Sequence, residues 1–195
     1  MIAIGYSQNN VLFLNANNYA PITNINTGHG VVFEVDWNWN TSFFTTCGSD
    51  DRLRTWNVSG TTFSAYRNED ENSDVLACRI ARNSARIARG TVSSRCIIDN
   101  FDFNSSTASN RGKSGQIKAV AWNDKTTRVM FGSSAKKLNY HDRAGDIVSF
   151  FNEYTVPTTV NTISITQDGD YMAFGGDDDK IYIWDMSTEG SEFLT

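Results

Sequence analysis

The amino-acid sequence predicts an all-β fold made of short strands, and two observations carry that prediction. First, runs of five or six residues rich in β-branched and aromatic side chains, such as IKAVAW at 117–122 and KIYIWD at 180–185, are separated by turn residues such as QDGD at 167–170. Second, the chain contains only two prolines and shows neither heptads nor a long apolar stripe of helical period. We therefore expect short strands joined by tight turns.

An internal repeat organises these strands. Residues 117–142 align without a gap on residues 160–185, so that Phe131 falls on Phe174 and Leu138 on Ile181. The block 28–57 falls on the same frame, as do the first residues of the chain, and a weaker copy occupies residues 75–100. One mostly aromatic position then recurs at steps of 42 or 43 residues, at Leu14, Trp56, Asp99, His141 and Trp184.

A period in the low forties, with about four short strands per unit, resembles the WD40 repeat, whose units are the blades of a β-propeller. The block GHGVVFEVDWNWNTSFFTTCGSDDRLRTWN carries the resemblance most fully, because it opens with Gly-His and closes with Trp-Asn. In WD40 blades a histidine, a Ser or Thr, an aspartate and a tryptophan form a hydrogen-bonded chain across the strands. The resemblance implies such a structural tetrad at His29, Thr46, Asp50 and Trp56.

The other repeats depart from this pattern. The last one retains Asp178 and Trp184, a partial tetrad, but has Phe174 in place of the hydroxyl residue and no histidine upstream. In the fourth, His141 replaces the tryptophan and Ala135 the aspartate. We therefore expect these blades to be held by packing rather than by a complete hydrogen-bonded tetrad.

The resemblance implies a single WD40-like propeller segment over residues 1–195, containing about four and a half blades. The first blade is expected to begin at its second strand, and the last to stop just after its third. The expected blade parts are residues 1–24, 25–70, 71–108, 109–153 and 154–195. Because propellers close with 4 to 8 blades, three readings stay open: part of a longer propeller, an arc completed by a partner chain, or a small self-closed ring.

Composition limits the class of protein. A net charge of -5 gives no general attraction to nucleic acid, and 39% apolar residues are enough to build a core. The chain has no apolar run long enough to cross a bilayer and does not open like a signal peptide. We expect a cytoplasmic protein, with the cytoskeleton or cilium as one setting and a nuclear location still open. The three cysteines, Cys47, Cys78 and Cys96, are interpreted as small buried hydrophobes.

One segment has a charge opposite to that of the rest. Between Val75 and Lys113 there are seven basic residues and two acidic ones. One interpretation is a blade that binds an acidic tail, a phosphopeptide or nucleic acid through arginines; the other is a solvated edge with salt bridges between blades. The candidate binding residues are Arg79, Arg82, Arg86, Arg89 and Arg95. Arg79 and Arg89 lie inside predicted strands, where a structural role is the alternative. Arg82 and Arg86 flank a turn and are expected to be the exposed pair.

The sequence predicts neither a catalytic site nor a metal-binding site. GKS at 112–114 lacks the first glycine of a phosphate-binding loop, and GGDDDK at 175–180 lacks the ligand spacing that calcium needs. With only two histidines, both on the repeat frame, a histidine-based active site is not expected. The sequence thus predicts a scaffold for protein–protein interaction without cofactor or enzymatic activity, and the arginine-rich blade is the alternative.

Overall fold

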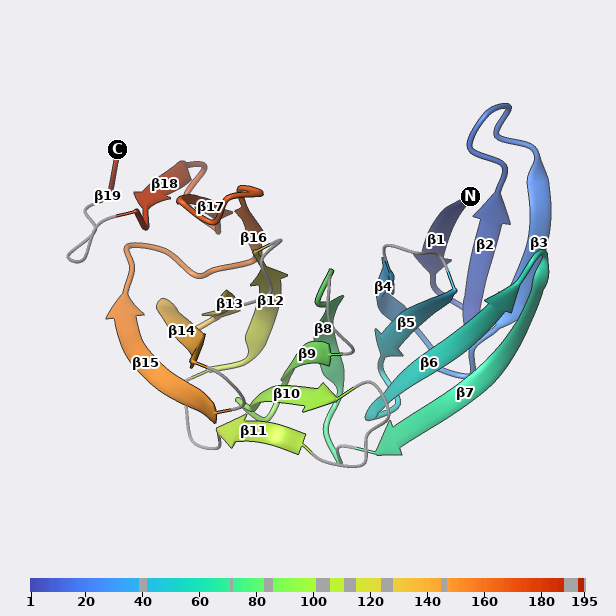
Figure 1. The fold of residues 1–195 in the computed structure, drawn as a ribbon, viewed down its shortest axis with the longest axis horizontal. Coiled ribbons are helices and arrows are strands. Elements are labelled where there is room, and N and C mark those ends of the chain that lie inside the picture. The colour runs from blue at the N-terminus through green and yellow to red at the C-terminus, as the bar shows by residue number, and fades with distance from the viewer. Residues whose placement is uncertain are drawn as a thin grey trace. The chain divides into compact units, whose positions relative to one another are not determined.

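The computed structural model describes residues 1–38, 42–70, 72–82, 86–100, 106–110, 115–123, 128–144, 147–187 and 193–194. In these residues every regular element is a β-strand, and the strands form five antiparallel sheets (Figure 1). Each sheet uses strands that follow one another in the chain, as the all-β prediction with local turns requires. The predicted fold class is therefore confirmed.

The first sheet has three strands and each of the others has four. The first contains β1 (Ile2–Tyr6), β2 (Asn10–Leu14) and β3 (Pro21–Asn26). The second contains β4 (Val32–Trp37), β5 (Phe43–Gly48), β6 (Arg52–Ser59) and β7 (Thr62–Asp70). The third contains β8 (Val75–Ile80), β9 (Arg86–Thr91), β10 (Cys96–Asn100) and β11 (Ser106–Asn110). The fourth contains β12 (Ile117–Trp122), β13 (Arg128–Ser133), β14 (Lys137–Ala144) and β15 (Ile147–Thr155). The fifth contains β16 (Thr162–Ile165), β17 (Tyr171–Gly175), β18 (Ile181–Asp185) and β19 (Phe193–Leu194).

The sheet boundaries differ slightly from the expected blade parts. The strands β3, β11 and β15 each extend two residues past the expected boundaries at 24, 108 and 153. The last blade does not stop after its third strand, because Trp184 of β18 pairs with Phe193 of β19. These differences all concern the last strand of a sheet.

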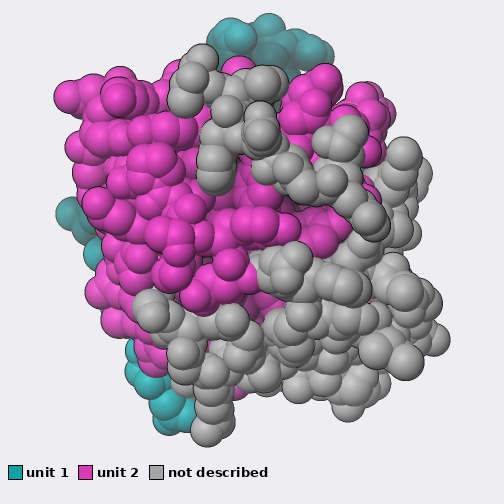
Figure 2. Space-filling view, turned by 90° about the vertical axis from the view of Figure 1, so that its left-hand side faces the viewer, with its two compact units in different colours: residues 1–78 teal, residues 79–195 magenta. Residues whose placement is uncertain are grey.

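The chain forms two compact units, Met1–Cys78 and Arg79–Thr195, coloured teal and magenta in Figure 2. The boundary between them lies within β8 rather than in a linker. The first unit contains the sheets β1–β3 and β4–β7, and the second contains β12–β15 and β16–β19 in full.

A turn of the same backbone conformation follows the second strand of each four-stranded sheet and follows β1 in the first sheet. Each of these turns includes a residue other than glycine with positive φ, between 58° and 68°; the residues are Asn9, Asp51, Ser94, Lys136 and Asp179. Asn and Asp tolerate this left-handed conformation better than most residues. The Asn- and Asp-rich turns of the sequence therefore reflect a backbone requirement that recurs once per sheet.

Neighbouring sheets within a unit pack face to face through apolar side chains. In the second unit, Met130 and Leu138 of the fourth sheet share a core with Met172, Phe174 and Trp184 of the fifth. In the first unit, the Phe13 ring of β2 lies 5.3 Å from that of Phe44 in β5, and 4.1 Å from that of Phe63 in β7. Each internal sheet contact is thus an ordinary close-packed core.

Small residues on the second strand permit this close approach. A Cβ atom on Gly132 would lie 2.3 Å from Cγ1 of Val160, and one on Gly90 would lie 2.3 Å from Cγ2 of Ile117. A Cβ on Gly5, at the equivalent place in the first sheet, would lie 2.6 Å from Cγ1 of Val32. In each case a β-branched side chain of the next repeat rests against the glycine.

We predict that Gly132→Ala lowers the stability of the protein by about 1–3 kcal/mol, because the added methyl group overlaps Val160. The matched control is Gly175→Ala, since a Cβ on Gly175 meets no atom closer than 3.6 Å. That variant is expected to change stability by less than about 0.5 kcal/mol. Thermal unfolding followed by circular dichroism checks both; equal shifts in Tm for the two variants would contradict the packing described here.

Candidate functional site

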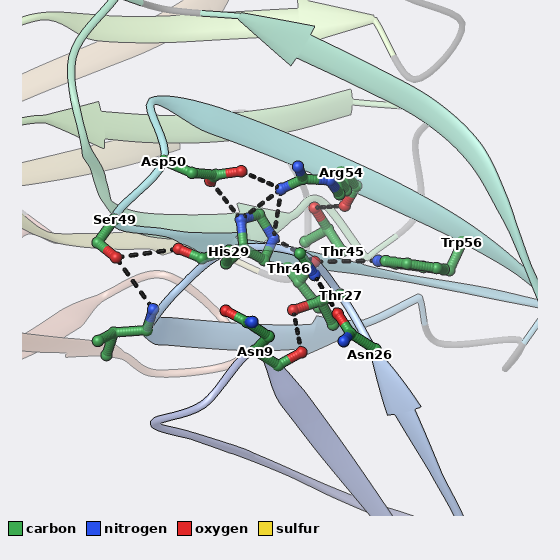
Figure 3. A network of polar contacts seen from close by, with 12 residues as sticks. Asn9, Asn26, Thr27, His29, Thr45, Thr46, Ser49, Asp50, Arg54 and Trp56 are labelled. Carbon is green, nitrogen blue, oxygen red and sulfur yellow. Dashed lines mark hydrogen bonds and ion pairs between the residues drawn. The ribbon is translucent and has the colours of Figure 1, made fainter.

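The four tetrad residues lie together on one face of the second sheet (Figure 3). His29 precedes β4, Thr46 belongs to β5, Asp50 lies in the following turn and Trp56 belongs to β6. His29 Nδ1 is 2.6 Å from Asp50 Oδ1, and His29 Nε2 is 2.7 Å from Thr46 Oγ1. Trp56 Nε1 is 3.0 Å from Thr46 Oγ1. One polar chain thus connects the loop before β4 with the next two strands.

The geometry assigns the direction of each hydrogen bond. The indole N–H of Trp56 is only a donor, so Thr46 Oγ1 accepts it and donates its own proton to His29 Nε2. His29 Nδ1 then carries the ring proton and donates it to the Asp50 carboxylate. A neutral imidazole with its proton on Nδ1 satisfies every member of the chain.

Local sequence holds His29 in place. The flanking residues Gly28 and Gly30 have φ values of 76° and 77°, a left-handed conformation that glycine adopts without strain. The Ser49 hydroxyl donates to the His29 carbonyl oxygen at 2.9 Å and accepts from the Val31 N–H at 3.0 Å. The loop is therefore clamped to the end of β5 before its side chain joins the tetrad.

Arg54 is a further member of this network that the sequence analysis did not name. Its Nη1 atom lies 2.6 Å from Asp50 Oδ2, to which it donates; it also lies 2.7 Å from His29 Nδ1, but two N–H donors do not hydrogen-bond to each other. Desolvation by burial lowers the pKa of His29, and the nearby Arg54 cation lowers it further. For Asp50, desolvation raises the pKa, but hydrogen bonds from His29 and Arg54 outweigh it and the net shift is downward. Asp50 is therefore the anion and His29 the neutral partner.

A hydroxyl, an imidazole and a carboxylate in series also form the arrangement of a nucleophilic catalytic site. Here the Thr46 and His29 side chains are fully buried, and the Thr46 oxygen already accepts a hydrogen bond from Trp56. A substrate carbonyl cannot reach that oxygen without opening the sheet contact. The arrangement is therefore suited to holding strands together rather than to acyl transfer.

The fourth and fifth sheets replace the tetrad with ring contacts. In the fifth sheet Phe174 stacks on Tyr182 with ring centroids 5.1 Å apart, and the Tyr182 hydroxyl donates to Asp178 at 2.6 Å. This hydrogen bond lowers the pKa of Asp178. Trp184 is buried and meets the Tyr154 ring edge-on at 4.4 Å. Asp178 thus bonds to a tyrosine two positions before the tryptophan.

In the fourth sheet, His141 is buried and lies edge-on to Phe131, with ring centroids 5.1 Å apart. Phe131 occupies the position of Thr46, and His141 that of Trp56. The same two positions that hydrogen-bond in the second sheet are therefore joined by an aromatic contact in the fourth.

The structure corrects part of the arginine hypothesis. Arg86 was expected to be exposed with Arg82, but it is the first residue of β9 and is buried, while Arg82 is exposed. Arg89 is also buried, and its Nη2 lies 2.9 Å from Asp99 Oδ2. Arg89 pairs with Asp99 because the two occupy the Thr46 and Trp56 positions of the third sheet. A buried cation with its own carboxylate is not a surface for an acidic ligand.

The remaining candidate arginines differ from Arg82 in their exposure. Arg79 and Arg95 are half-buried, and the Arg79 carbonyl oxygen accepts a hydrogen bond from Trp122 Nε1 at 3.1 Å. Arg111 and Lys113 lie outside the described residues. Of the five candidate arginines, Arg82 alone is classed as exposed.

Among the described residues, no three His, Cys, Asp or Glu side chains are grouped so that they could hold a metal ion. Nor do the described residues contain a helix of the length and hydropathy that a bilayer crossing needs. All three cysteines are buried free thiols, as predicted.

Tandem four-stranded antiparallel sheets, with a His-Thr-Asp-Trp network in one of them, define a protein built from propeller-type blades. The family model described as "WD domain, G-beta repeat" matches residues 21–57 and 146–185. Each match spans the last strand of one sheet and the first three strands of the next. The chain therefore contains two segments that match the WD40 repeat. Among curated proteins, none matches the chain significantly.

We predict that acid weakens the protein through this tetrad. The folded-state pKa of His29 is below its ordinary value of 6.5, so the unfolded chain takes up the proton first and stability falls as the pH drops below about 6.5. One such group changes stability by at most about 1.4 kcal/mol per pH unit. The lowered pKa of Asp50 acts in the same direction, with its loss starting below about 3.8.

The measurement is Tm between pH 7.5 and 5.5 for the natural chain and for His29→Gln. We expect the variant to have a lower Tm throughout and a shallower pH dependence. His141→Gln, which changes the only other histidine, separates the two contributions. Parallel pH curves for the natural chain and His29→Gln would contradict the assigned protonation state.

A second prediction concerns the buried ion pair of the third sheet. Arg89→Met leaves the Asp99 carboxylate buried without its partner cation, and we expect a loss of about 3–5 kcal/mol. Arg82→Met is the matched control on an exposed site and is expected to stay within about 0.5 kcal/mol. Chemical denaturation of both variants makes the comparison; similar midpoints would show that Arg89 contributes no more than a surface charge.

Proposed function

We propose that this protein is a non-catalytic scaffold that holds other proteins together in a multiprotein assembly. WD40 repeats generally mediate protein–protein interactions, and WD40 domains typically have no catalytic role. The observation that carries the proposal is the match of two repeats to the WD40 model on a tandem array of small sheets. Such sheets form rigid cores, and their turns remain available for contact with partners.

The distribution of reactive side chains supports a binding role. Both histidines and all three cysteines are buried within the sheets, and His29 makes hydrogen bonds through both ring nitrogens. Arg89, the central arginine of the basic segment, is paired with Asp99. These groups therefore stabilise the fold, which leaves the polar turns and the sheet faces to make external contacts.

The recurrent turns offer suitable contact points. In the second unit the turn residues Lys136 and Asp179 are both exposed, and they carry opposite charges. Polar turns at a fixed place in every repeat favour recognition of a protein surface by many weak contacts rather than of one small ligand. We propose other proteins as partners on this basis.

We also propose a cytoplasmic location, with a cytoskeletal or ciliary assembly as one setting. The three free thiols support this proposal, because proteins of oxidising compartments more often hold their cysteines as disulfides. Imaging of a tagged full chain in the source cell tests it, and accumulation in the secretory pathway would contradict it.

The scaffold proposal predicts that the tagged full chain, recovered from native extract of the source cell, carries a defined set of other proteins. These proteins should appear in fixed ratios and remain bound at about 0.3 M salt, where exposed ionic contacts are strongly screened. The tag alone is the control for non-specific capture. Two results together would contradict the proposal: the chain migrates at its own mass in fresh extract, and the tagged chain captures no protein beyond those captured by the tag alone.

A further inference from the structure

One sheet position is buried four times and exposed once. The position lies in the third strand of each four-stranded sheet and in β2 of the first sheet. Its residue pairs with a glycine or a cysteine on the preceding strand. The five residues are Val11, Leu53, Cys96, Leu138 and Ile181. The first four are at most 1% exposed, whereas Ile181 is 78% exposed.

The contrast has a clear cause within the second unit. Leu138 lies on the face of the fourth sheet that packs against the fifth, in the core shared with Met172 and Phe174. Ile181 lies on the corresponding face of the fifth sheet, beside Ile183 and opposite Gly175. We call this surface, with Tyr171, Ala173, Gly175, Ile181 and Ile183, the C-terminal face. The same face carries Thr162 and Ser164 of β16, which pair with Gly175 and Ala173. Its apolar residues Tyr171, Ile181 and Ile183 are exposed.

The first sheet has an exposed residue at another position, one that is buried in the other four sheets. Ile4 of β1 occupies the sheet position held elsewhere by Thr46, Arg89, Phe131 and Phe174. Those four residues are at most 4% exposed, whereas Ile4 is 43% exposed. Its neighbours across the strand pair place Ile2, Leu12 and Leu14 on the same surface. We call these four residues the N-terminal face.

The two faces are related as the two sides of an internal sheet contact. In the second unit, a surface of the C-terminal kind, with Leu138 and Met130, packs against a surface of the N-terminal kind, with Phe174 and Trp184. In the first unit, Val11 and Phe13 pack in the same way against the face of the second sheet. The Phe174 and Trp184 positions correspond to Ile4 and Leu14, which are also apolar. Each of the two exposed faces therefore carries apolar residues at positions that, in an internal contact, are covered by a face of the other kind.

We propose that two copies of this chain associate head to tail, with the C-terminal face of one copy packed on the N-terminal face of another. A second copy is the occupant that the residues favour, because every chain offers both halves of the contact. Large exposed apolar surface is rare on proteins that have no partner. The contact uses different surfaces on the two copies, so it is heterologous and permits growth into a ring or a chain. This association does not depend on the proposed scaffold function.

The test uses the full chain and two charge variants, one for each face. Ile181→Lys places a cation on the C-terminal face, and Ile4→Glu places an anion on the N-terminal face. Both sites are exposed, so folding is expected to be retained, and far-UV circular dichroism checks it. Analytical ultracentrifugation then gives the mass from about 1 µM to about 200 µM, where contacts with micromolar Kd become populated.

We expect the natural chain to rise above 21.8 kDa with concentration, and each variant alone to stay at that mass. Mixing the two variants restores one contact, between the intact C-terminal face of Ile4→Glu and the intact N-terminal face of Ile181→Lys. The mixture should therefore contain at least a dimer of twice the single mass. The matched control Tyr19→Lys changes an exposed residue between β2 and β3, outside both faces, and should associate like the natural chain.

Three results would overturn the proposal. The natural chain stays at 21.8 kDa over the whole range, which leaves the faces to some other protein. Both variants associate as the natural chain does, which places the contact elsewhere. The variants lose association but their mixture stays monomeric, which excludes the head-to-tail arrangement. None of these results bears on capture of other proteins from extract, so this proposal and the scaffold proposal fail separately.

Discussion

The contact between the second and third strands of the four-stranded sheets is the constraint on which the rest of this structure depends. Side chains at this place are buried in all four of these sheets, so every polar atom there needs a partner. In the second sheet, the hydrogen bonds that connect Trp56, Thr46, His29 and Asp50 in series supply these partners. Because His29 comes from the loop before β4, the same solution also fixes where the sheet begins.

Other sheets solve the same problem with different chemistry at the same two positions. The third uses the buried pair Arg89–Asp99, and the fourth an edge-on contact of Phe131 with His141. An ion pair in the interior contributes little net stability but is costly to break, whereas an aromatic contact tolerates changes of partner. The repeat therefore preserves the position and the burial of this contact rather than its residue types. This explains why the repeats look so unequal in sequence while their sheets have a common plan.

The sequence predicted the parts of the fold that follow local rules. Short apolar runs and Asn- or Asp-rich turns indicate strands and left-handed turns directly, and the period of 42 or 43 residues gave the order of the sheets. Of the tetrad, His29 and Trp56 stood out because both residue types are rare in the chain. Arg54 did not, since an arginine in a strand has many possible partners and only the folded sheet brings it to Asp50.

Arg86 shows where sequence reasoning failed, and Arg89 shows where it left two roles open. Arginine is usually exposed, and a basic segment in an acidic chain suggests a binding surface. The alternation of side chains along β9 instead turns Arg89 toward Asp99. The repeat frame identified the position of Asp99, but the sequence analysis did not pair its charge with Arg89. The short strand β19 was missed for another reason: two residues carry no alternation from which a strand is recognised.

The recurrent glycines determine which packing the sheets adopt. Apolar area alone does not fix how one sheet lies on another, because the hydrophobic effect has no direction. A β-branched side chain resting on a glycine does fix it, since Val160 fits against Gly132 at a place where any Cβ would collide. The same arrangement joins Ile117 to Gly90 and Val32 to Gly5. A shift of one residue would bring a larger side chain to each of these points and turn the apolar alternation of the strand to the wrong face. The glycine contacts therefore carry the register from one sheet to the next, while the hydrogen-bonded or aromatic contacts between the second and third strands satisfy the groups buried there.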